Sequence, residues 1–320
     1  MSDDAAAARP GLKLDTTVSH SARIWNYWLG GKDNFAVDRE AGDRVAAMLP
    51  SIVAQARADR AFLGRAIWYL AGEAGIRQFL DIGTGLPTAD NTHEVAQRVA
   101  PEARIVYADN DPLVLSHARA LLTSTPAGVC DYIDGDLREP DKILAEAGRT
   151  LDFTQPVALM LLGILHHISD ADLAYSIVRR LMAALAPGSF LAINHSTSAV
   201  HGAAMEEAVA HWNRVGTPPM TLRSPQQIAR FFDGLDLLEP GVVSCSRWRP
   251  PPSQVGGQPA EVDEFCGVAA NRDAPRGASL YLRFSREELR GRVWSAPVPV
   301  RRGGRSRSAG RRLLVRRAGR

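Results

Sequence analysis

One short loop carries the first residues whose types and spacing could do chemistry. The apolar run 79–82 has an acid, Asp81, inside it and is followed by Gly83 and Gly85. Glycines at such a point let the backbone pass close to a ligand, because no Cβ is in the way. Open parallel sheets bind ligands at the carboxyl ends of their strands, so a cofactor loop is one interpretation. An ordinary strand-to-helix turn is the other.

Two further acids favour the cofactor interpretation. Asp109 ends the apolar run of IVYADNDP, where its carboxylate could accept both hydroxyls of a ribose. Asp111 is followed by Pro112, which is typical of a helix start, so we interpret Asp111 as a cap. Asp136, in YIDGDLREP, could accept a hydrogen bond from an adenine amino group. Together with Asp81, these acids at successive strand ends predict an adenosine site.

Adenosine occurs in nicotinamide dinucleotides and in S-adenosylmethionine, and the glycine loop discriminates between them. A dinucleotide places its pyrophosphate at a helix N-terminus and needs a third glycine, but Leu86, Pro87 and Thr88 follow Gly85. Pro87 also lacks the amide hydrogen that a phosphate could use. Asp81 would repel a diphosphate, whereas it suits the ammonium group of a methionine moiety, directly or through water. The loop therefore favours S-adenosylmethionine.

Histidines follow two later apolar runs. LLGILHHISD places His166 and His167 after the fourth predicted strand, where a neutral imidazole could take a proton from a methyl acceptor. Methyl transfer is an in-line displacement, which needs such a base only if the acceptor must lose a proton. Alternatively, both histidines pack or hydrogen-bond at the start of the next helix. His166 and His167 are our candidate catalytic residues, and His195 in INHSTS is a candidate pocket residue.

The N-terminal string ARIWNYWLGGKDNF combines aromatic and polar residues around a glycine pair. A helix that ends at this pair could fold over the cofactor as a lid. Trp25 and Trp28 are three residues apart, so we expect them to pack against the protein. Tyr27, Lys32 and Asn34 are the candidate substrate or cofactor contacts of this segment.

The elements that must position these residues alternate along the chain. Such alternation of strand-like and helix-like segments predicts an α/β fold with a parallel sheet and helices on both faces. The predicted strands are 78–82, 104–108, 132–133, 157–162, 190–193, 237–246 and 264–269. The predicted helices lie within 41–71 and near 91–99, 112–122, 141–147, 172–185, 203–215 and 225–232.

Composition limits the classes of protein. The 320 residues are 45% hydrophobic, but the longest apolar run, 157–165, is far shorter than the ~20 residues of a membrane span. The N-terminus lacks the basic start and apolar core of a secretory signal. Cys130, Cys245 and Cys266 are widely spaced and suggest neither disulfides nor a zinc site. We therefore expect a cytoplasmic protein with reduced thiols, no membrane association and no bound metal.

The chain divides into four predicted parts. Residues 1–18 are small, polar and without periodicity, which indicates disorder. Residues 19–75 form the helical lid region, and residues 76–270 form the core that binds S-adenosylmethionine. Residues 271–320 carry 15 arginines and three acidic side chains, so their net charge of +12 leaves −9 on the rest of the chain. This extension is predicted to be disordered.

The arginine-rich extension could contact nucleic acid through phosphates, without sequence preference. An unstructured extension that adds nothing to the main activity is the favoured interpretation. The run after the fourth strand contains neither the Asp/Asn-Pro-Pro-aromatic motif of amino-directed methyltransferases nor a Pro-Cys nucleophile. These absences argue against nucleobases and glutamine as methyl acceptors.

The motifs DIGTG, YADND and DGDL resemble the successive cofactor motifs of class I S-adenosylmethionine-dependent methyltransferases. HSARIWNYWLGGKDNFAVDREA, FLDIGTGLPTADNTHEVAQ and ARFFDGLDLLEPGVV resemble an actinobacterial family of such enzymes, formerly described as a domain of unknown function. The likeness extends from about His20 to Val268. It implies a Rossmann-like, doubly wound, seven-stranded and mostly parallel sheet.

The resemblance also implies roles for individual residues. The implied cofactor-binding residues are Asp81, Gly83, Gly85, Asp109, Asn110, Asp136 and Leu137. The first three belong to the cofactor loop, Asp109 to the ribose site, and Asp136 with the Leu137 backbone to the adenine site. We therefore expect a methyltransferase that acts on an unidentified small molecule. A non-catalytic S-adenosylmethionine-binding protein and an NAD-dependent oxidoreductase are the alternatives, and the sequence does not indicate an oligomeric state.

Overall fold

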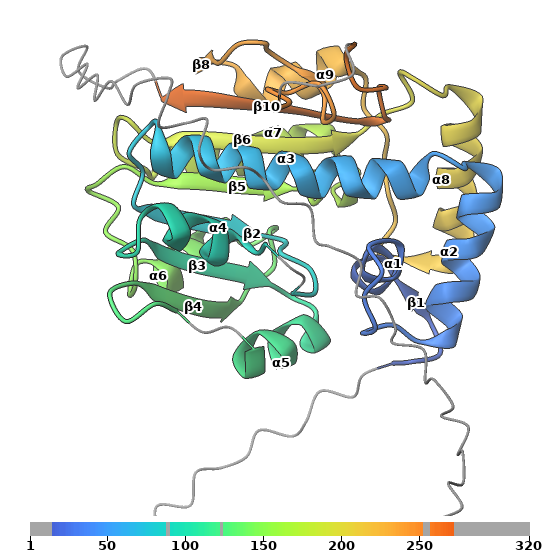
Figure 1. The fold of residues 1–320 in the computed structure, drawn as a ribbon, viewed down its shortest axis with the longest axis horizontal. Helices are drawn as coiled ribbons and strands as arrows, with labels where there is room; N and C mark the ends of the chain where they lie inside the picture. The colour runs from blue at the N-terminus through green and yellow to red at the C-terminus, as the bar shows by residue number, and fades with distance from the viewer. Residues whose placement is uncertain (1–14, 88–89, 122–123, 252–256, 272–320) are drawn as a thin grey trace, which may run out of the picture. The chain divides into compact units, whose positions relative to one another are not determined.

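The computed structural model describes residues 15–87, 90–121, 124–251 and 257–271 (Figure 1). Nearly all of the predicted disordered N-terminus and of the arginine-rich extension lies outside these residues, so both interpretations stay predictions.

A mostly parallel sheet forms the centre of the described chain. Its strand order is β4-β3-β2-β5-β6-β10-β8, and β9 pairs with β10 beside this path (Figure 1). The strands are β2 (Gln78–Ile82), β3 (Arg104–Asp109), β4 (Val129–Asp134), β5 (Ala158–Leu162), β6 (Phe190–Ser196), β8 (Leu235–Leu237), β9 (Val243–Ser244) and β10 (Glu264–Asn271). Strands β2 to β6 are parallel, whereas β10 is antiparallel to its neighbours. The predicted doubly wound sheet is confirmed.

The strand order creates a switch point between β2 and β5. From β2 the chain moves outward to β3 and β4, then returns to the other side of β2 as β5 and β6. The connections after β2 and β5 therefore leave in opposite directions. In such sheets, ligands bind at the carboxyl ends of the strands beside this point. This topology places the loop that holds Gly83 and Gly85 beside the loop that follows β5.

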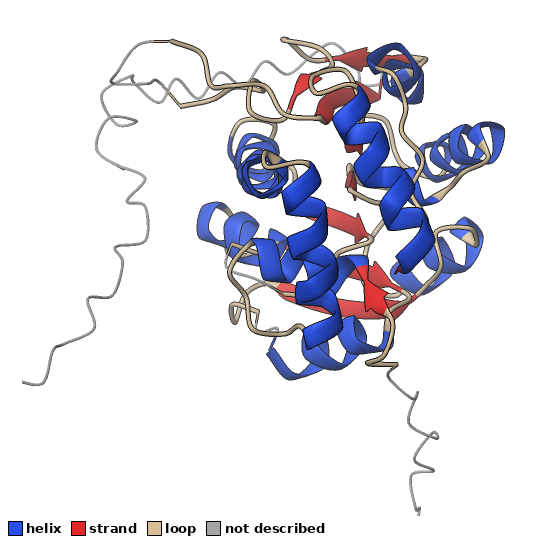
Figure 2. Cartoon of the chain, turned by 90° about the vertical axis from the view of Figure 1, so that its right-hand side faces the viewer, coloured by secondary structure: helices blue, strands red, loops and turns tan. Residues whose placement is uncertain are grey.

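Helices cover both faces of the sheet, as Figure 2 shows. Because side chains alternate along a strand, Phe79 packs on one face and Leu80 on the other. The first face is covered by α3 (Ile52–Gly72) and α4 (Thr92–Val99), and the second by α6 (Pro140–Ala147) and α7 (Ala171–Ala183). Burial on both faces explains why these strands are continuous apolar runs in the sequence.

The N-terminal helices pack against a distant helix. Helices α1 (Ser21–Trp28) and α2 (Ala36–Met48) bury apolar side chains with α8 (Ala203–Val215), which follows β6. Strand β1 (Ser19–His20) pairs with β7 (Gly216–Thr217). The buried ion pair between Arg23 and Asp38, 3.1 Å long, joins α1 to α2. Within 19–75, α3 therefore differs from α1 and α2, because it packs on the sheet.

The remaining elements are α5 (Pro112–Leu121), α9 (Pro225–Ala229) and the short 3-10 helices η1 (Leu165–His167) and η2 (Arg230–Phe232). Among the residues that the structure describes, no helix combines the length and the apolar character that crossing a membrane requires.

Candidate active site

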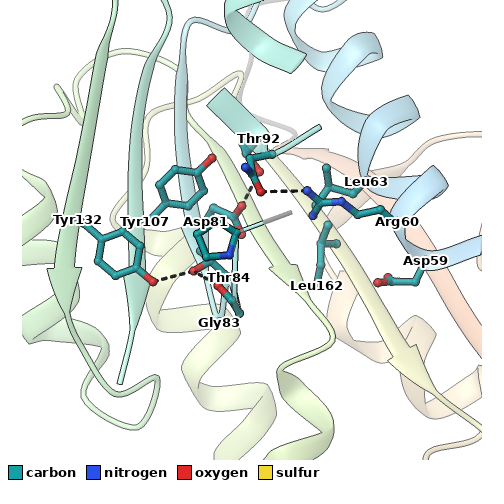
Figure 3. Close-up of a pocket in the computed structure, with 13 residues that line it drawn as sticks. Asp59, Arg60, Leu63, Asp81, Gly83, Thr84, Thr92, Tyr107, Tyr132 and Leu162 are labelled. Atoms are coloured by element: carbon teal, nitrogen blue, oxygen red, sulfur yellow. Dashed lines mark hydrogen bonds between the residues drawn. The ribbon is translucent and has the colours of Figure 1, made fainter. Parts of the chain in front are cut away.

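A pocket lies at the switch point, between the carboxyl ends of the strands and α3 (Figure 3). Three predicted cofactor residues, Asp81, Gly83 and Gly85, line it. Asp59 and Arg60 of α3 line it as well, although neither was predicted from the sequence to be a site residue. The other lining residues are Leu63, Thr84, Pro87, Asn91, Thr92, Tyr107, Tyr132 and Leu162.

The glycine loop has a backbone that requires glycine. Gly83 and Gly85 have φ angles of +78° and +63°, in the left-handed region that side chains rarely adopt. A Cβ on Gly83 would also lie 2.6 Å from the side chain of Ile164, in the loop after β5. Gly83 therefore allows the two loops of the switch point to approach each other closely.

Two carboxyls, Asp81, which is buried, and Asp109, which is half-buried, hold this loop in place. Asp81 accepts a hydrogen bond from the Thr92 hydroxyl at the start of α4. Asp109 accepts one from the Gly85 amide at 3.0 Å and one from the Asp111 amide at 2.9 Å. Burial raises the pKa of each carboxyl, Asp81 and Asp109, to about 6, because it disfavours the charged form. A cation bound in the pocket beside Asp81 would favour its ionisation.

The predicted adenine-side residues lie at the ends of β3 and β4. Asn110 donates a hydrogen bond of 3.3 Å to Asp136, which connects the two loops. The Arg138 amide donates to the same carboxylate at 2.9 Å, and Leu137 is buried. Asn110, Asp136 and Leu137 are not among the residues that line the pocket, and neither is Asp109. Their cofactor roles stay predictions.

Asp59 and Arg60 approach the pocket from neighbouring positions of α3 (Figure 3). Arg60 donates a hydrogen bond of 3.0 Å to Asn91, the residue before α4. Asp59 accepts a hydrogen bond from the amide group of Asn194 on β6. Burial raises the pKa of Asp59 to about 7; attraction to Arg60 opposes this shift and repulsion by Asp81 adds to it.

The predicted histidines form a buried cluster after β5 and β6. His166, His167 and His195 are 1%, 9% and 0% exposed, and none lines the pocket. The ring centroid of His166 lies 4.3 Å from that of His167 and 5.7 Å from that of His195. Burial lowers the pKa of all three, to about 4 for His167 and about 3 for His195. All three are therefore neutral at physiological pH.

Hydrogen bonds fix the tautomers of two of these rings. His195 accepts a hydrogen bond of 2.7 Å from Arg223 at Nε2, so Nδ1 carries the proton and donates to the Ser196 carbonyl at 2.8 Å. His167 Nδ1 donates to the Pro219 carbonyl at 2.9 Å. Both nitrogens of His195 are thus occupied. The catalytic and pocket roles assigned to these histidines stay predictions.

A buried carboxyl lies next to the histidine cluster. Glu264 Oε2 accepts hydrogen bonds from Gln55 at 3.1 Å and from the Ser196 hydroxyl at 2.7 Å. Burial raises the pKa of Glu264 well above its usual value, which favours the protonated, neutral form. The Ser196 hydroxyl also lies 3.3 Å from His166 Nδ1. Glu264 therefore belongs to a network of neutral groups.

Of the predicted lid residues, Tyr27 lies in α1, and Lys32 and Asn34 lie on the turn after it; none of the three lines the pocket. Tyr27 donates a hydrogen bond of 2.7 Å to Asp43, and Lys32 is exposed. Asn34 donates to Asn26 at 3.0 Å, which stabilises the turn itself. Their roles toward a substrate or cofactor also stay predictions.

The start of the N-terminal segment comes closer to the cofactor loop. A Cβ built on Gly85 would lie 4.0 Å from the Ala22 Cβ of α1. His20 Nδ1 lies 3.1 Å from a carboxylate oxygen of Asp111, directly after β3. The segment therefore lies beside the glycine loop at Ala22 and beside the turn after β3 at His20.

The pocket lies within a sequence that matches a known family. A model of the S-adenosyl methyltransferase family matches residues 7–272. The chain belongs to this family. The family suggested by the sequence motifs is thus confirmed, and with it methyl transfer as the reaction and S-adenosylmethionine as the cofactor.

Two solved structures resemble this methyltransferase over most of their length. A DUF574 family protein from Streptomyces avermitilis is 43% identical, with 80% of this chain and 99% of that chain covered and a TM-score of 0.77. A protein from Thermobifida fusca, proposed to be a methyltransferase, is 39% identical, with 79% and 95% covered and a TM-score of 0.72. Both sources are actinobacteria, as the sequence motifs implied. No curated protein matches the sequence.

The charges of the pocket fit the cofactor of this methyltransferase. The methionine end of S-adenosylmethionine carries an ammonium, a carboxylate and a sulfonium. The pocket offers the carboxyls of Asp59 and Asp81 and the guanidinium of Arg60. Opposite charges within a partly buried site attract strongly, so these side chains can bind both ends of the zwitterion.

The sequence contained a weak signal for Asp59, but none for Arg60. Gln55, Asp59 and Leu63 are spaced by four, so they share one side of α3. Two of these positions are polar, although the helix packs its apolar side chains on the sheet. A polar residue at such a spacing indicates a helix that borders a polar site, but it does not reveal which strand it faces.

Proposed function

We propose that the protein transfers a methyl group from S-adenosylmethionine, bound at the switch-point pocket, to a small molecule that enters on the side of β5 and β6. The observation that supports this most is the position of Asp81 and Arg60 in one pocket beside the glycine loop. When bound, the cofactor supplies an electrophilic methyl group on a positively charged sulfur. The protein must bind it, orient it and exclude water.

In this proposal, Asp109 accepts hydrogen bonds from the ribose hydroxyls, with Asn110 beside it. Each Asp109 oxygen accepts one backbone hydrogen bond and retains a second lone pair for a hydroxyl. Asp136 and the Leu137 backbone contact the adenine. Arg60 binds the methionine carboxylate, and Asp81 binds the ammonium directly or through water.

A small acceptor is favoured by what surrounds the pocket. Helix α3 forms one wall, and the N-terminal segment lies beside the glycine loop at Ala22 and beside the turn after β3 at His20. The net charge of −9 on residues 1–270 would repel nucleic acid. The sequence also lacks the acceptor motifs of base-directed enzymes. A cytoplasmic location, predicted from the sequence, is part of this proposal.

Ligand binding tests the cofactor site. In isothermal titration calorimetry, S-adenosylhomocysteine should bind, and Asp109→Ala should weaken binding by about 10-fold or more, because a charge-assisted hydrogen bond is lost. The matched control is Asp134→Ala, which removes an exposed carboxylate opposite Asp109 on β4. Preferential binding of NAD, or equal losses in both variants, would contradict the proposal.

A further inference from the structure

The two neighbouring charges on α3 are tied to different parts of the sheet. Arg60 is hydrogen-bonded to Asn91, in the connection that follows β2. Asp59 is hydrogen-bonded to Asn194 of β6. Since the strand order is β4-β3-β2-β5-β6, Arg60 lies toward the proposed cofactor side and Asp59 lies farther from it, toward β6. The two side chains therefore face different parts of the pocket.

Asn194 fixes the direction of the Asp59 carboxyl. Its Oδ1 accepts a hydrogen bond from the amide of Gly163, which can only donate, so its NH₂ group must face Asp59. Asn194 is 0% exposed, so this arrangement is enclosed. Within residues 15–87, 90–121, 124–251 and 257–271, the Asp59 carboxyl makes no other hydrogen bond. The second Asp59 oxygen is thus available to the pocket that Asp59 lines.

The candidate bases on this side differ in access and in basicity. The predicted His166 and His167 are enclosed and outside the pocket lining, and burial lowers the pKa of His167 to about 4. Asp59 lines the pocket, and burial raises its pKa to about 7. A general base works best with a pKa near the working pH and within reach of the proton. Asp59 meets both conditions better.

We propose that Asp59 faces the transferable methyl group and accepts the proton from the hydroxyl or amino group that becomes methylated, while Asn194 is its positioning residue. This inference rests on the proposed function and adds the acceptor side to it. The acceptor is accordingly a molecule with a hydrogen on the reacting oxygen or nitrogen.

The step balances as a single displacement. The acceptor's O–H or N–H proton moves to the free oxygen of Asp59, and the acceptor lone pair forms a bond to the methyl carbon. The carbon–sulfur bond breaks, and its electron pair remains on sulfur as the neutral thioether of S-adenosylhomocysteine. Asp59 then releases its proton to solvent.

The charged groups around Asp59 influence whether its carboxyl is ionised. Arg60 attracts a negative charge there and Asp81 opposes it. Glu264 and Cys245 also face Asp59, but burial raises the pKa of each well above its usual value, which favours their neutral forms. A cationic group bound next to Asp59 would therefore stabilise its charged form, whereas a neutral group would not.

Three ligands that differ only at the reacting centre test the position of Asp59. S-adenosylmethionine carries a sulfonium, sinefungin carries an ammonium on carbon in its place, and S-adenosylhomocysteine is neutral there. At pH 8, Asp59→Asn should weaken binding of the first two by about 10-fold, because a charge-assisted contact is lost. S-adenosylhomocysteine affinity should change less than about 2-fold, which also shows that the variant is folded. Glu73→Gln, an exposed acid after α3, is the control.

The other outcomes distinguish failure of this inference from failure of the proposed function. Equal weakening of all three ligands would overturn the inference, because Asp59 would then bind the amino-acid end that they share. Unchanged binding of all three would overturn it too. If wild-type protein binds none of them, the proposed function itself fails.

A pH profile tests the proton-accepting role and Asn194. The ratio of S-adenosylmethionine to S-adenosylhomocysteine affinity should rise with pH as Asp59 ionises, and Asp59→Asn should remove this rise. Asn194→Ala removes a hydrogen bond to the charged form, so the midpoint of the rise should move to higher pH. Because a purely structural role of Asn194 would not move the midpoint, an unchanged midpoint contradicts its positioning role. A rise that persists in Asp59→Asn overturns the role of Asp59.

Discussion

The proposed cofactor side and the proposed acceptor side of the site handle buried polar groups differently. On the cofactor side, Asp81 and Asp109 have pKa values raised to about 6 and lie at or next to the pocket. On the acceptor side, His195, Arg223 and Glu264 are buried in a network where each finds partners within the protein. With pKa values of about 6, the carboxyls of the first half are mostly charged at neutral pH. The second half combines neutral histidines with the Arg223 guanidinium in a hydrogen-bonded support for the loop after β5.

Arg223 explains how that support is built. It is 3% exposed, and its guanidinium donates to the carbonyl of Leu165, the first residue of η1, at 3.1 Å and to that of Ile168, just after η1, at 2.7 Å. The same guanidinium donates to His195. Strand β6 and the turn after β5 are therefore linked through one side chain. The histidines that looked catalytic in the sequence belong to this framework or pack against it.

The largest expected effect comes from breaking this buried hydrogen-bonded support. Arg223→Ala should lower the free energy of unfolding by about 3–5 kcal/mol, because two carbonyls and a ring nitrogen lose their donor in a buried site. Urea denaturation measures this change. Exposed Arg179, on the neighbouring α7, gives the control Arg179→Ala, with a change below about 0.5 kcal/mol. Similar values for both variants would show that the network does not stabilise the fold.

A smaller loss of stability is expected where the loop after β2 approaches the loop after β5, at Gly83 and Ile164. Gly83→Ala places a Cβ against Ile164 at a left-handed backbone position and should cost about 2–3 kcal/mol. S-adenosylhomocysteine affinity should fall as well, because the loop must move. Gly75→Ala is matched, since φ is +72° there but no atom lies within 4 Å of the added Cβ. If only strain matters, the two variants will have equal stability.

A pH series sharpens the comparison through Glu264. Its folded-state pKa is raised above the unfolded value, so its contribution is complete below about pH 4.5 and is lost as pH rises toward the folded value. The loss reaches at most about 1.4 kcal/mol per pH unit. Glu264→Gln keeps the hydrogen-bonding shape without a charge, so its stability relative to wild type should increase from pH 5.5 to pH 8. Parallel stability curves for the two proteins would contradict protonation of Glu264.

The smallest effect is expected at His167. His167→Gln should change S-adenosylhomocysteine affinity by less than about 2-fold, because the ring is neutral and outside the pocket lining. Calorimetry at pH 7.5 measures it, with Asp109→Ala as the positive control. A loss of affinity as large as that of the control would show that His167 belongs to the cofactor half, which would contradict the division of the site into two halves.

The sequence predicted the sheet well because its strands are buried on both faces. The predicted strand 78–82 matches β2, and Asp81 with its two glycines lies in the pocket. The predicted strand 237–246 was wrong as a single element. A turn at Gly241, where φ is +87°, separates β8 from β9, and each pairs with a different part of β10. Apolar content alone did not mark this interruption.

The amino-acid sequence by itself determined which segments form strands and helices, the glycine loop and the type of ligand. These features depend on local periodicity and on residues close together in the chain. Only the tertiary structure decided which ionisable groups share the pocket and which are neutralised. Asp59 meets Asn194 across 135 positions of sequence, and no local pattern encodes such a contact. Burial, which depends on the whole fold, then sets the pKa values that separate Asp59 from the histidines.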